Sequence, residues 1–309
     1  MAMQTVLILG ATGHIGPYLV AAAREAKKDV RVLLRPETAT STQADKRATL
    51  DAFQKQGATF VEGAIEDTAS LERACRGVDA VISCVNGPQL QHQVALAEVA
   101  RKAGARRFIP SEFGLDVVLT PKGSCLLFDW KRDLHEPLQK TGIAVTYVYS
   151  NGFFPFWAAC LGQLGLVAPP EREIEVFGEG NVKMALLSME DIAAYTVCML
   201  DEPKTENREV SMLPSVNLVT QEELIRLWER LSQKKLHRRY LSAATLDRNI
   251  AELAAKPEKM GELIYAQIAR SAWIQGIAGK RRADVLEATE LFPQRPPVTV
   301  EAYLRGFLH

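Results

Sequence analysis

A glycine-rich loop near the start of the chain constrains the fold more than any other feature. The loop Gly10-Ala11-Thr12-Gly13-His14-Ile15-Gly16 follows the apolar run Val6–Leu9 directly and opens an amphipathic stretch, Ile15–Ala26. Small residues at a strand-to-helix turn let the backbone approach a pyrophosphate, whose charge is met by the helix N–H groups. A tight turn without a ligand is the alternative, but the strand before and the helix after favour a dinucleotide site.

The first half of the chain alternates short β-branched runs with longer amphipathic stretches. This alternation predicts βαβ units, and hence an α/β fold with a doubly wound parallel sheet of Rossmann type. Gly77, Gly104 and Gly142 stand where helices should end before the next strand. The expected strands are Val6–Leu9, Val30–Leu34, Thr59–Val61, Ala80–Cys84, Phe108–Pro110 and Ala144–Val148.

The character of the sequence changes after Asn151. An aromatic cluster is followed by a Pro169-Pro170 break, and then by a predicted hairpin from Glu173 to Leu187 that turns near Gly178 and Gly180. We therefore expect a dinucleotide-binding domain over residues 1–153 and a smaller α+β substrate-binding domain over residues 154–309. Residues 188–215 read as a helix–strand pair that returns to the first sheet.

Charge and cysteine content exclude several classes of function. Lys+Arg and Asp+Glu are both 37, so no net charge attracts nucleic acid or an acidic membrane. No apolar run approaches the length of a membrane span, and the first residues lack a leader pattern, so we expect a cytoplasmic protein. The five cysteines form no CxxC pair and favour reduced, buried thiols, with no metal site.

The end of the second expected strand indicates which dinucleotide binds. Arg35 stands there, nineteen residues after Gly16, where an acidic residue would select NAD and an arginine accommodates the 2′-phosphate of NADP. Lys46 follows in a polar stretch and is a second candidate for the phosphate, although a solvated charge run is the alternative. His14 is expected at the loop surface or beside the phosphates. The predicted cofactor is NADPH.

Several segments together resemble one family. They are the glycine loop, Arg107-Phe108-Ile109-Pro110-Ser111-Glu112-Phe113-Gly114, Val145–Asn151, Gly178–Asp191 and Glu287–Pro293. The chain is similar over essentially its whole length to the isoflavone reductase, pinoresinol–lariciresinol reductase and phenylcoumaran benzylic ether reductase group, within the NmrA-like atypical short-chain dehydrogenases/reductases. One departure is Ala64, where many relatives carry an acidic residue, so we expect Asp67 or backbone groups to replace its adenine contacts.

The usual acid of short-chain dehydrogenases is absent, because no tyrosine is followed by a lysine four residues later. The resemblance implies Lys131 as the general acid/base instead. Sequence alone would favour an exposed helix lysine at this position. Pro137 should kink or end the helix that carries Lys131 early, and Trp130, Leu134 and Leu138 are expected to form its buried stripe.

The remaining candidate residues follow the expected strand ends or the aromatic cluster. Parallel sheets bind ligands at their carboxyl edge, and a cluster of aromatic rings suits a flat aromatic substrate. For each aromatic residue singly, a place in the core is the default. The expected cofactor contacts are Gly10, Thr12, Gly13, His14, Ile15, Gly16, Arg35, Lys46, Asn86, Gln89, Ser111, Glu112, Phe113, Lys131, Asn151 and Phe153, and the expected substrate contacts are Phe113, Phe153, Phe154 and Trp157.

Together these observations and the resemblance predict an NADPH-dependent reductase of a small aromatic substrate, such as a phenylpropanoid, lignan or isoflavonoid. The alternative is a non-catalytic, NADP(H)-sensing regulator similar to NmrA-like proteins. A reductase or racemase of a non-aromatic metabolite is a third hypothesis. A homodimer is a possible assembly.

Overall fold

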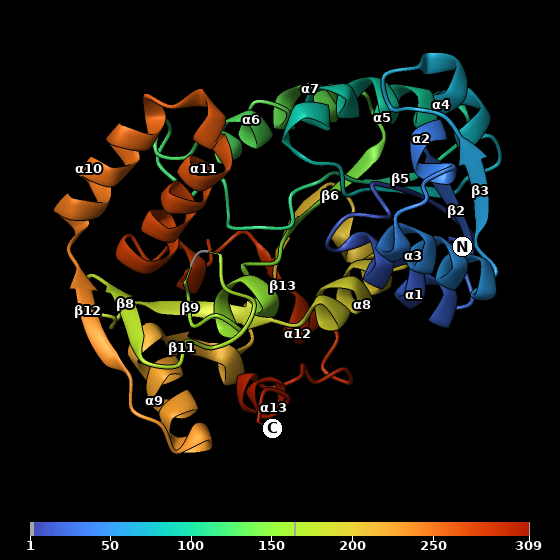
Figure 1. The fold of residues 1–309 in the computed structure, drawn as a ribbon. Helices are drawn as coiled ribbons and strands as arrows, with labels where there is room; N and C mark the ends of the chain where they lie inside the picture. The colour runs from blue at the N-terminus through green and yellow to red at the C-terminus, as the bar shows by residue number, and fades with distance from the viewer. Residues whose placement is uncertain (1–2, 164, 309) are drawn as a thin grey trace. The chain divides into compact units, whose positions relative to one another are not determined.

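The computed structural model describes residues 3–163 and 165–308, and the chain divides into two compact units (Figure 1). The first unit contains the described residues up to Phe113 together with Trp130–Val148 and Met189–Val210. The second contains Gly114–Asp129, Tyr149–Ser188 and the described residues from Ser211 onward. Each unit is considered by itself below.

A parallel sheet forms the centre of the first unit. Its strands lie in the order β10-β6-β5-β4-β1-β2-β3, and every neighbouring pair from β6 to β3 is parallel. The order 3-2-1-4-5-6 is that of a Rossmann fold, so the predicted doubly wound sheet is confirmed. The strands are β1 (Thr5–Leu9), β2 (Asp29–Leu34), β3 (Thr59–Glu62), β4 (Ala80–Ser83), β5 (Arg107–Ile109), β6 (Ala144–Tyr149) and β10 (Arg208–Ser211).

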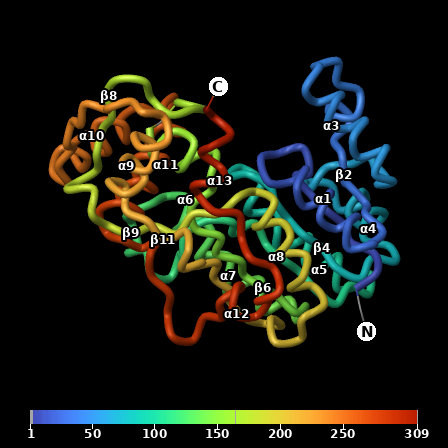
Figure 2. The backbone as a smooth tube through the Cα atoms, turned by 90° about the horizontal axis from the view of Figure 1, so that it is seen from below, coloured from blue at the N-terminus to red at the C-terminus, as the bar shows by residue number. Residues whose placement is uncertain are grey.

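Helices cover this sheet because their apolar faces pack on its strands, of which the central ones are buried. Val6–Ile8 of β1 are completely inaccessible to solvent, as expected for a central parallel strand. Helices α4 and α5 lie side by side (Figure 2). The helices are α1 (Gly16–Glu25), α2 (Pro36–Ala39), α3 (Ala44–Lys55), α4 (Thr68–Cys75), α5 (Gln93–Lys102), α7 (His135–Lys140) and α8 (Met189–Leu200); α6 (Leu126–Arg132) has residues in both units.

The second unit combines small sheets with helices. One sheet has the order β11-β9-β7, and β8 pairs in parallel with β12. Its strands are β7 (Gly152–Phe153), β8 (Glu173–Phe177), β9 (Lys183–Leu187), β11 (Leu218–Thr220), β12 (His237–Leu241) and β13 (Leu286–Glu287). Its helices are α9 (Gln221–Ser232), α10 (Ala243–Ala254), α11 (Met260–Ala269), α12 (Ala288–Leu291) and α13 (Val300–Arg305).

The predicted hairpin from Glu173 to Leu187 is wrong, although both of its strands exist. Strands β8 and β9 belong to different sheets. Side-chain amides occupy an edge of β8: Gln163 exchanges hydrogen bonds with the backbone N–H and C=O of Glu175 at 2.9 and 3.0 Å. Gln221 likewise accepts from the N–H of Phe177 at 2.8 Å. Because these amides satisfy backbone groups of β8, those groups need no hairpin partner.

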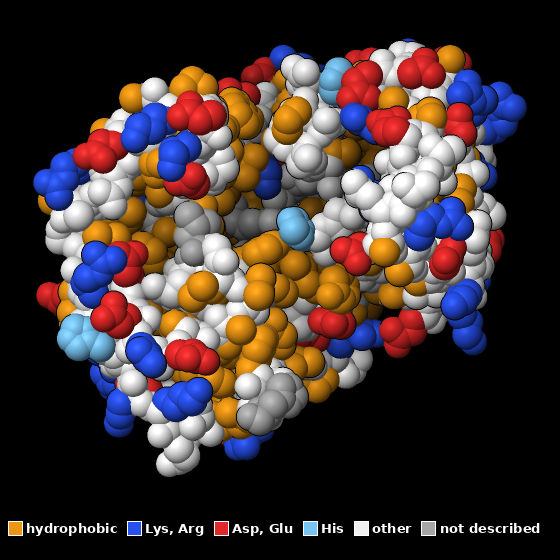
Figure 3. Space-filling model, viewed as in Figure 1, with side chains coloured by type: hydrophobic (Ala, Val, Ile, Leu, Met, Phe, Trp, Pro, Cys, Tyr) orange, Lys and Arg blue, Asp and Glu red, His pale blue; other side chains and the backbone are white. Residues whose placement is uncertain are grey.

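The surface carries no extended region of a single charge on the face seen in Figure 3, where cationic and anionic side chains are interspersed. Within the described residues, no helix combines the length and the apolar character that crossing a bilayer requires.

Candidate cofactor and proton-transfer site

The glycine loop joins β1 to α1 through two positions that admit no side chain. Gly10 has φ +73°, and a Cβ added there would lie 2.4 Å from the carbonyl oxygen of Cys84. A Cβ on Gly16, the first residue of α1, would lie 2.3 Å from the carbonyl oxygen of Ala11. Glycine at these positions therefore lets the ends of β1 and β4 and the start of α1 approach closely.

A cavity of about 280 Å³ opens at this carboxyl edge of the sheet. Glycine-loop backbone forms one wall, and the residues that follow β2, β3 and β4 form the others. This arrangement fits a dinucleotide, because the glycines leave backbone N–H groups accessible where side chains would otherwise fill the space. Its lining includes Gly10, Ala11, Thr12, Gly13, Arg35, Thr38, Gly63, Ala64, Ile65, Cys84, Val85, Asn86 and Gln89.

Of the expected cofactor contacts, the cavity brings together the glycine loop, Arg35, Asn86 and Gln89. It is not lined by His14, Ile15, Gly16, Lys46, Ser111, Glu112, Phe113 or Lys131. Ile15 and Gly16 are buried beneath the loop, whereas His14 lies exposed on it. Lys46 is exposed on α3. The loop and the ends of β2 and β4 thus meet as the sequence indicates, whereas Lys46 does not reach the cavity wall.

Arg35 lies at the cavity wall and is held by acidic neighbours. Its Nη2 donates to Oε1 of Glu66 at 2.7 Å, and its Nη1 lies 3.9 Å from Oε1 of Glu37. The Arg35 side chain is 40% exposed, so solvent screens both ion pairs. A guanidinium here is suited to a 2′-phosphate, for which Glu66 competes.

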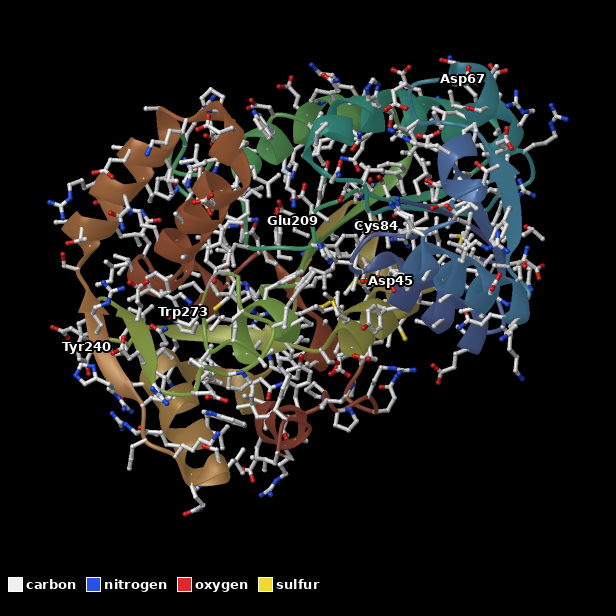
Figure 4. The ribbon with its side chains drawn as sticks, in the orientation of Figure 1. Asp45, Asp67, Cys84, Glu209, Tyr240 and Trp273 are labelled. Atoms are coloured by element: carbon white, nitrogen blue, oxygen red, sulfur yellow. The ribbon has the colours of Figure 1, made fainter. Side chains whose placement is uncertain are left out.

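The loop after β3, for which the sequence predicts adenine contacts from Asp67 or backbone groups, forms part of the wall, and its Gly63 and Ile65 were not named as cofactor contacts. Ser70 shapes it, because its hydroxyl donates to the carbonyl oxygen of Ala64 at 3.0 Å and accepts from the Ala64 N–H at 3.1 Å. Asp67, the expected adenine contact, caps α4 by accepting from the N–H groups of Ala69 and Ser70 (Figure 4). The position of Gly63 just after a parallel strand could have indicated this wall.

Cys84 lines the cavity from the end of β4 (Figure 4). Burial raises the pKa of its thiol to about 12. The thiol therefore stays protonated at neutral pH, and its Sγ donates to the carbonyl oxygen of Leu9 at 2.8 Å. Cys84 acts here as a small wall residue, as expected for a reduced thiol.

The Pro110–Gly114 loop leaves β5 at the same edge of the sheet in a constrained conformation. Phe113 has φ +35°, which is unusual for a residue with a side chain. Ser111 anchors the loop: its N–H donates to Oε1 of Gln93 and its hydroxyl to the carbonyl oxygen of Val85, both at 2.8 Å. The Phe113 N–H donates to the carbonyl oxygen of Val148 at 3.0 Å. The loop is thus fixed by α5, by β6 and by the segment that follows β4.

Lys131 is buried, with 7% of its surface exposed, and its Nζ donates to the carbonyl oxygen of Glu112 in this loop. The helix ends at Arg132 and a new one begins at His135, so Pro137 lies in a first helical turn, where its missing N–H costs little. The expectation that the proline would break this stretch is confirmed. Trp130, expected in the buried stripe, is instead 41% exposed.

The aromatic candidates lie in the second unit and pack mainly on one another and their neighbours. Phe154 is fully buried, with its ring centroid 4.7 Å from that of Tyr303. Trp157 stacks on Tyr265 at 5.0 Å and an interplanar angle of 11°. Phe153 stacks on Phe156, which is the exposed ring of the stretch at 36%.

Asn151, another expected cofactor contact, is buried with φ +56°. Its side-chain amide donates to the carbonyl oxygen of Met212 at 2.9 Å, and its N–H donates to the carbonyl oxygen of Gly114 at 3.0 Å. These bonds give Asn151 a role in the second unit's own structure. Among the described residues, no group of three His, Cys, Asp or Glu side chains is arranged to hold a metal ion.

The Rossmann sheet, the glycine loop and the cavity at the switch point between β1 and β4 define a dinucleotide-binding protein. The model of the NmrA-like family matches residues 2–304. The chain belongs to the NmrA-like family, and the predicted resemblance is confirmed.

Several proteins similar to the chain are plant reductases. Phenylcoumaran benzylic ether reductase IRL1 of Ginkgo biloba is 34% identical over 316 residues, covering 100% of both chains. The structure of AtPrR2 with NADP+ and (+)pinoresinol has a TM-score of 0.89 and 30% identity, covering 100% of this chain and 99% of that one. A leucoanthocyanidin reductase–NADPH complex from Vitis vinifera has a TM-score of 0.88 and 27% identity, covering 98% and 99%.

Proposed function

We propose that this protein is a reductase of small aromatic substrates of the phenylpropanoid, lignan or isoflavonoid type, with Lys131 as the proton-transfer group. The chain is an NADPH-dependent oxidoreductase, as its full-length relatives with NADP cofactors indicate. The substrate class and the role of Lys131 are the proposal. The observation that carries it is the buried Lys131 amine, held at the loop that follows β5.

The residues of the cavity hold the cofactor in this proposal. The glycine-loop N–H groups and the start of α1 meet the pyrophosphate, and Arg35 meets the 2′-phosphate. When bound, NADPH supplies a hydride to the substrate. Asn86 and Gln89, after β4, border the ribose on the nicotinamide side.

Lys131 is suited to move a proton because it is buried. Removal from water generally disfavours the ammonium form of a lysine, which is one means by which enzymes tune lysine acid–base catalysts. The bond to the Glu112 carbonyl oxygen fixes the direction of the amine. In this proposal Lys131 takes a phenolic proton from the substrate, which leaves negative charge on the ring oxygen, and returns a proton to that oxygen once the substrate has accepted the hydride.

Aromatic side chains orient the substrate in this proposal. Phe113 directly follows Glu112, whose carbonyl oxygen accepts from Lys131, and is therefore a candidate substrate contact in this proposal. Phe153, Phe154 and Trp157 remain candidate substrate contacts. Flat apolar rings and a small number of polar groups are typical of pockets for aromatic ligands.

The test is NADPH oxidation by the purified protein with phenylcoumarans, furofuran lignans, isoflavones and coniferyl-type esters. Turnover of one class is expected, with Arg35→Ala raising the KM for NADPH about tenfold through loss of a charged hydrogen bond. Turnover of non-aromatic carbonyl compounds alone would contradict the aromatic substrate class.

A further inference from the structure

A cluster of ionisable side chains lies beside Glu112 of the Pro110–Gly114 loop, inside the first unit. His135 is 13% exposed, and Nε2 of its ring lies 3.0 Å from Oε1 of Glu112. Its other nitrogen, Nδ1, lies 4.0 Å from Oε1 of Glu209 on β10. Glu209 is labelled in Figure 4. The imidazole therefore stands between two carboxylates from different elements.

The cluster is fixed by Tyr147 of β6. The ring of His135 packs on that of Tyr147 with centroids 4.1 Å apart, and the phenol donates to the carbonyl oxygen of His135 at 3.1 Å. Burial raises the pKa of Tyr147, and the charges of Glu112 and Glu209 raise it further, so the phenol stays neutral. The ring of His135 is consequently held in one orientation.

Glu112 connects this cluster to Lys131 through a single residue. Its carboxylate is 3% exposed and takes the His135 hydrogen bond, while its backbone carbonyl oxygen accepts from Lys131 Nζ. Oε2 of Glu112 is buried without a hydrogen-bond partner among the described residues. The His135 bond is therefore the main restraint that the structure shows on the buried carboxylate.

We propose that His135 is a positioning residue, which orients the Lys131 amine by anchoring Glu112. This inference rests on the proposed role of Lys131. Removing the imidazole leaves a buried carboxylate with no donor, so Glu112 rotates toward water or toward the Lys131 amine. Either movement alters the bond between Lys131 Nζ and the Glu112 carbonyl oxygen.

A measurement without substrate tests this directly. Lysine labelled with 13C at Cε reports the titration of each amine in the cofactor-free protein, and the Lys131 signal is assigned by its absence in Lys131→Arg. His135→Leu is expected to raise the Lys131 midpoint by about half a pH unit or more, since an unanchored carboxylate favours the ammonium form. His135→Gln, which retains a donor for Glu112, should return the midpoint at least halfway.

The control is Glu136→Gln, on the next residue of α7, whose carboxylate is exposed and pairs with Lys140. It should leave the midpoint unchanged. Equal midpoints in wild type and His135→Leu would overturn the proposal. Equal shifts in His135→Leu and His135→Gln would also overturn it, because the charge of the ring and not its hydrogen bond would then be responsible.

Kinetics separate this inference from the proposed function. With an accepted substrate, His135→Leu should lower kcat about tenfold, which is less than the loss expected when the acid–base group itself is removed. The KM for NADPH should stay within about twofold of wild type. In a Lys131→Ala background the same substitution should cause no further loss. An additive loss would overturn the positioning role, whereas wild-type turnover by Lys131→Ala alone would contradict only the proposed function.

Discussion

Arg35 illustrates how much of the site depends on single residues. Its guanidinium pairs with Glu66 at 2.7 Å, and both side chains are about 40% exposed. A bound 2′-phosphate would bring its negative charge close to the Glu66 carboxylate. On the proposed assignment of Arg35 to the 2′-phosphate, Glu66 should therefore weaken the preference for NADPH.

Replacing Glu66 by glutamine should strengthen NADPH binding. Because an exposed ion pair contributes at most about 1 kcal/mol, we expect the NADPH Kd to fall about two- to fivefold, with the NADH Kd unchanged. Fluorescence titration with both cofactors measures this. Glu37→Gln, whose carboxylate lies farther away at 3.9 Å, is the matched control and should have a smaller effect. An equal change for NADPH and NADH would contradict the assignment.

At this scale the sequence indicates which residues stand at strand ends, but not what they contact. Arg35 was predicted because it directly follows a strand at a fixed distance from the glycine loop. Its partner Glu66 lies 31 residues away, and no local sequence pattern predicts this ion pair. The burial of Lys131 could not be predicted from the sequence either, because helical spacing alone favours an exposed lysine.

Among the elements, strands were easier to predict than their pairing. The runs Glu173–Phe177 and Lys183–Leu187 are strands, yet they lie in different sheets. Local periodicity predicts that a segment is a strand, whereas the pairing of that strand depends on which hydrogen-bonding groups lie against each of its edges. Here the amides of Gln163 and Gln221 reach the edge of β8, from 12 and 46 residues away.

An ion pair joins α9 to β12 and gives the second unit a pH-dependent contribution to stability. Arg238 donates to Glu229 at 2.9 Å, and this bond lowers the pKa of Glu229 to about 2. A depressed carboxyl pKa stabilises the fold above the unfolded value, about 4.3, and the contribution is lost as pH falls toward 2.

Glu229→Gln should therefore lower the free energy of unfolding at pH 7 by up to about 3 kcal/mol. The difference from wild type should shrink as the pH falls from about 4.5 to 2, because the Glu229 carboxyl of wild type becomes protonated first in the unfolded and then in the folded state. Urea unfolding at several pH values measures this, with the exposed Glu173→Gln as control. A difference that is constant with pH would refute the ionic origin.

For the whole molecule, cofactor binding should appear as selective stabilisation. The cavity is formed by residues of the first unit, so NADPH at about 100 times its Kd should stabilise that unit by about 2.7 kcal/mol. Scanning calorimetry should show a higher transition temperature with NADPH than with NADH at the same concentration. Identical shifts with the two cofactors would contradict the assignment of Arg35 to the 2′-phosphate.

The fold class of the whole molecule was predictable because its determinants are local and repeated. A glycine loop after a strand, followed by alternating strands and helices, leaves few topologies once crossovers are right-handed. The order β3-β2-β1-β4-β5-β6 is the expected result. The His135 cluster, in contrast, joins a loop, a helix and two strands, so it required the structure.

In the proposed mechanism Lys131 transfers a proton while the glycine loop and Arg35 hold NADPH. The most direct measurement compares wild type and Lys131→Ala for NADPH Kd and for single-turnover reduction of an accepted aromatic substrate. We expect the Lys131→Ala variant to keep an NADPH Kd within about twofold of wild type and to reduce the substrate at least about a hundredfold more slowly. Reduction at the wild-type rate by Lys131→Ala would contradict this mechanism.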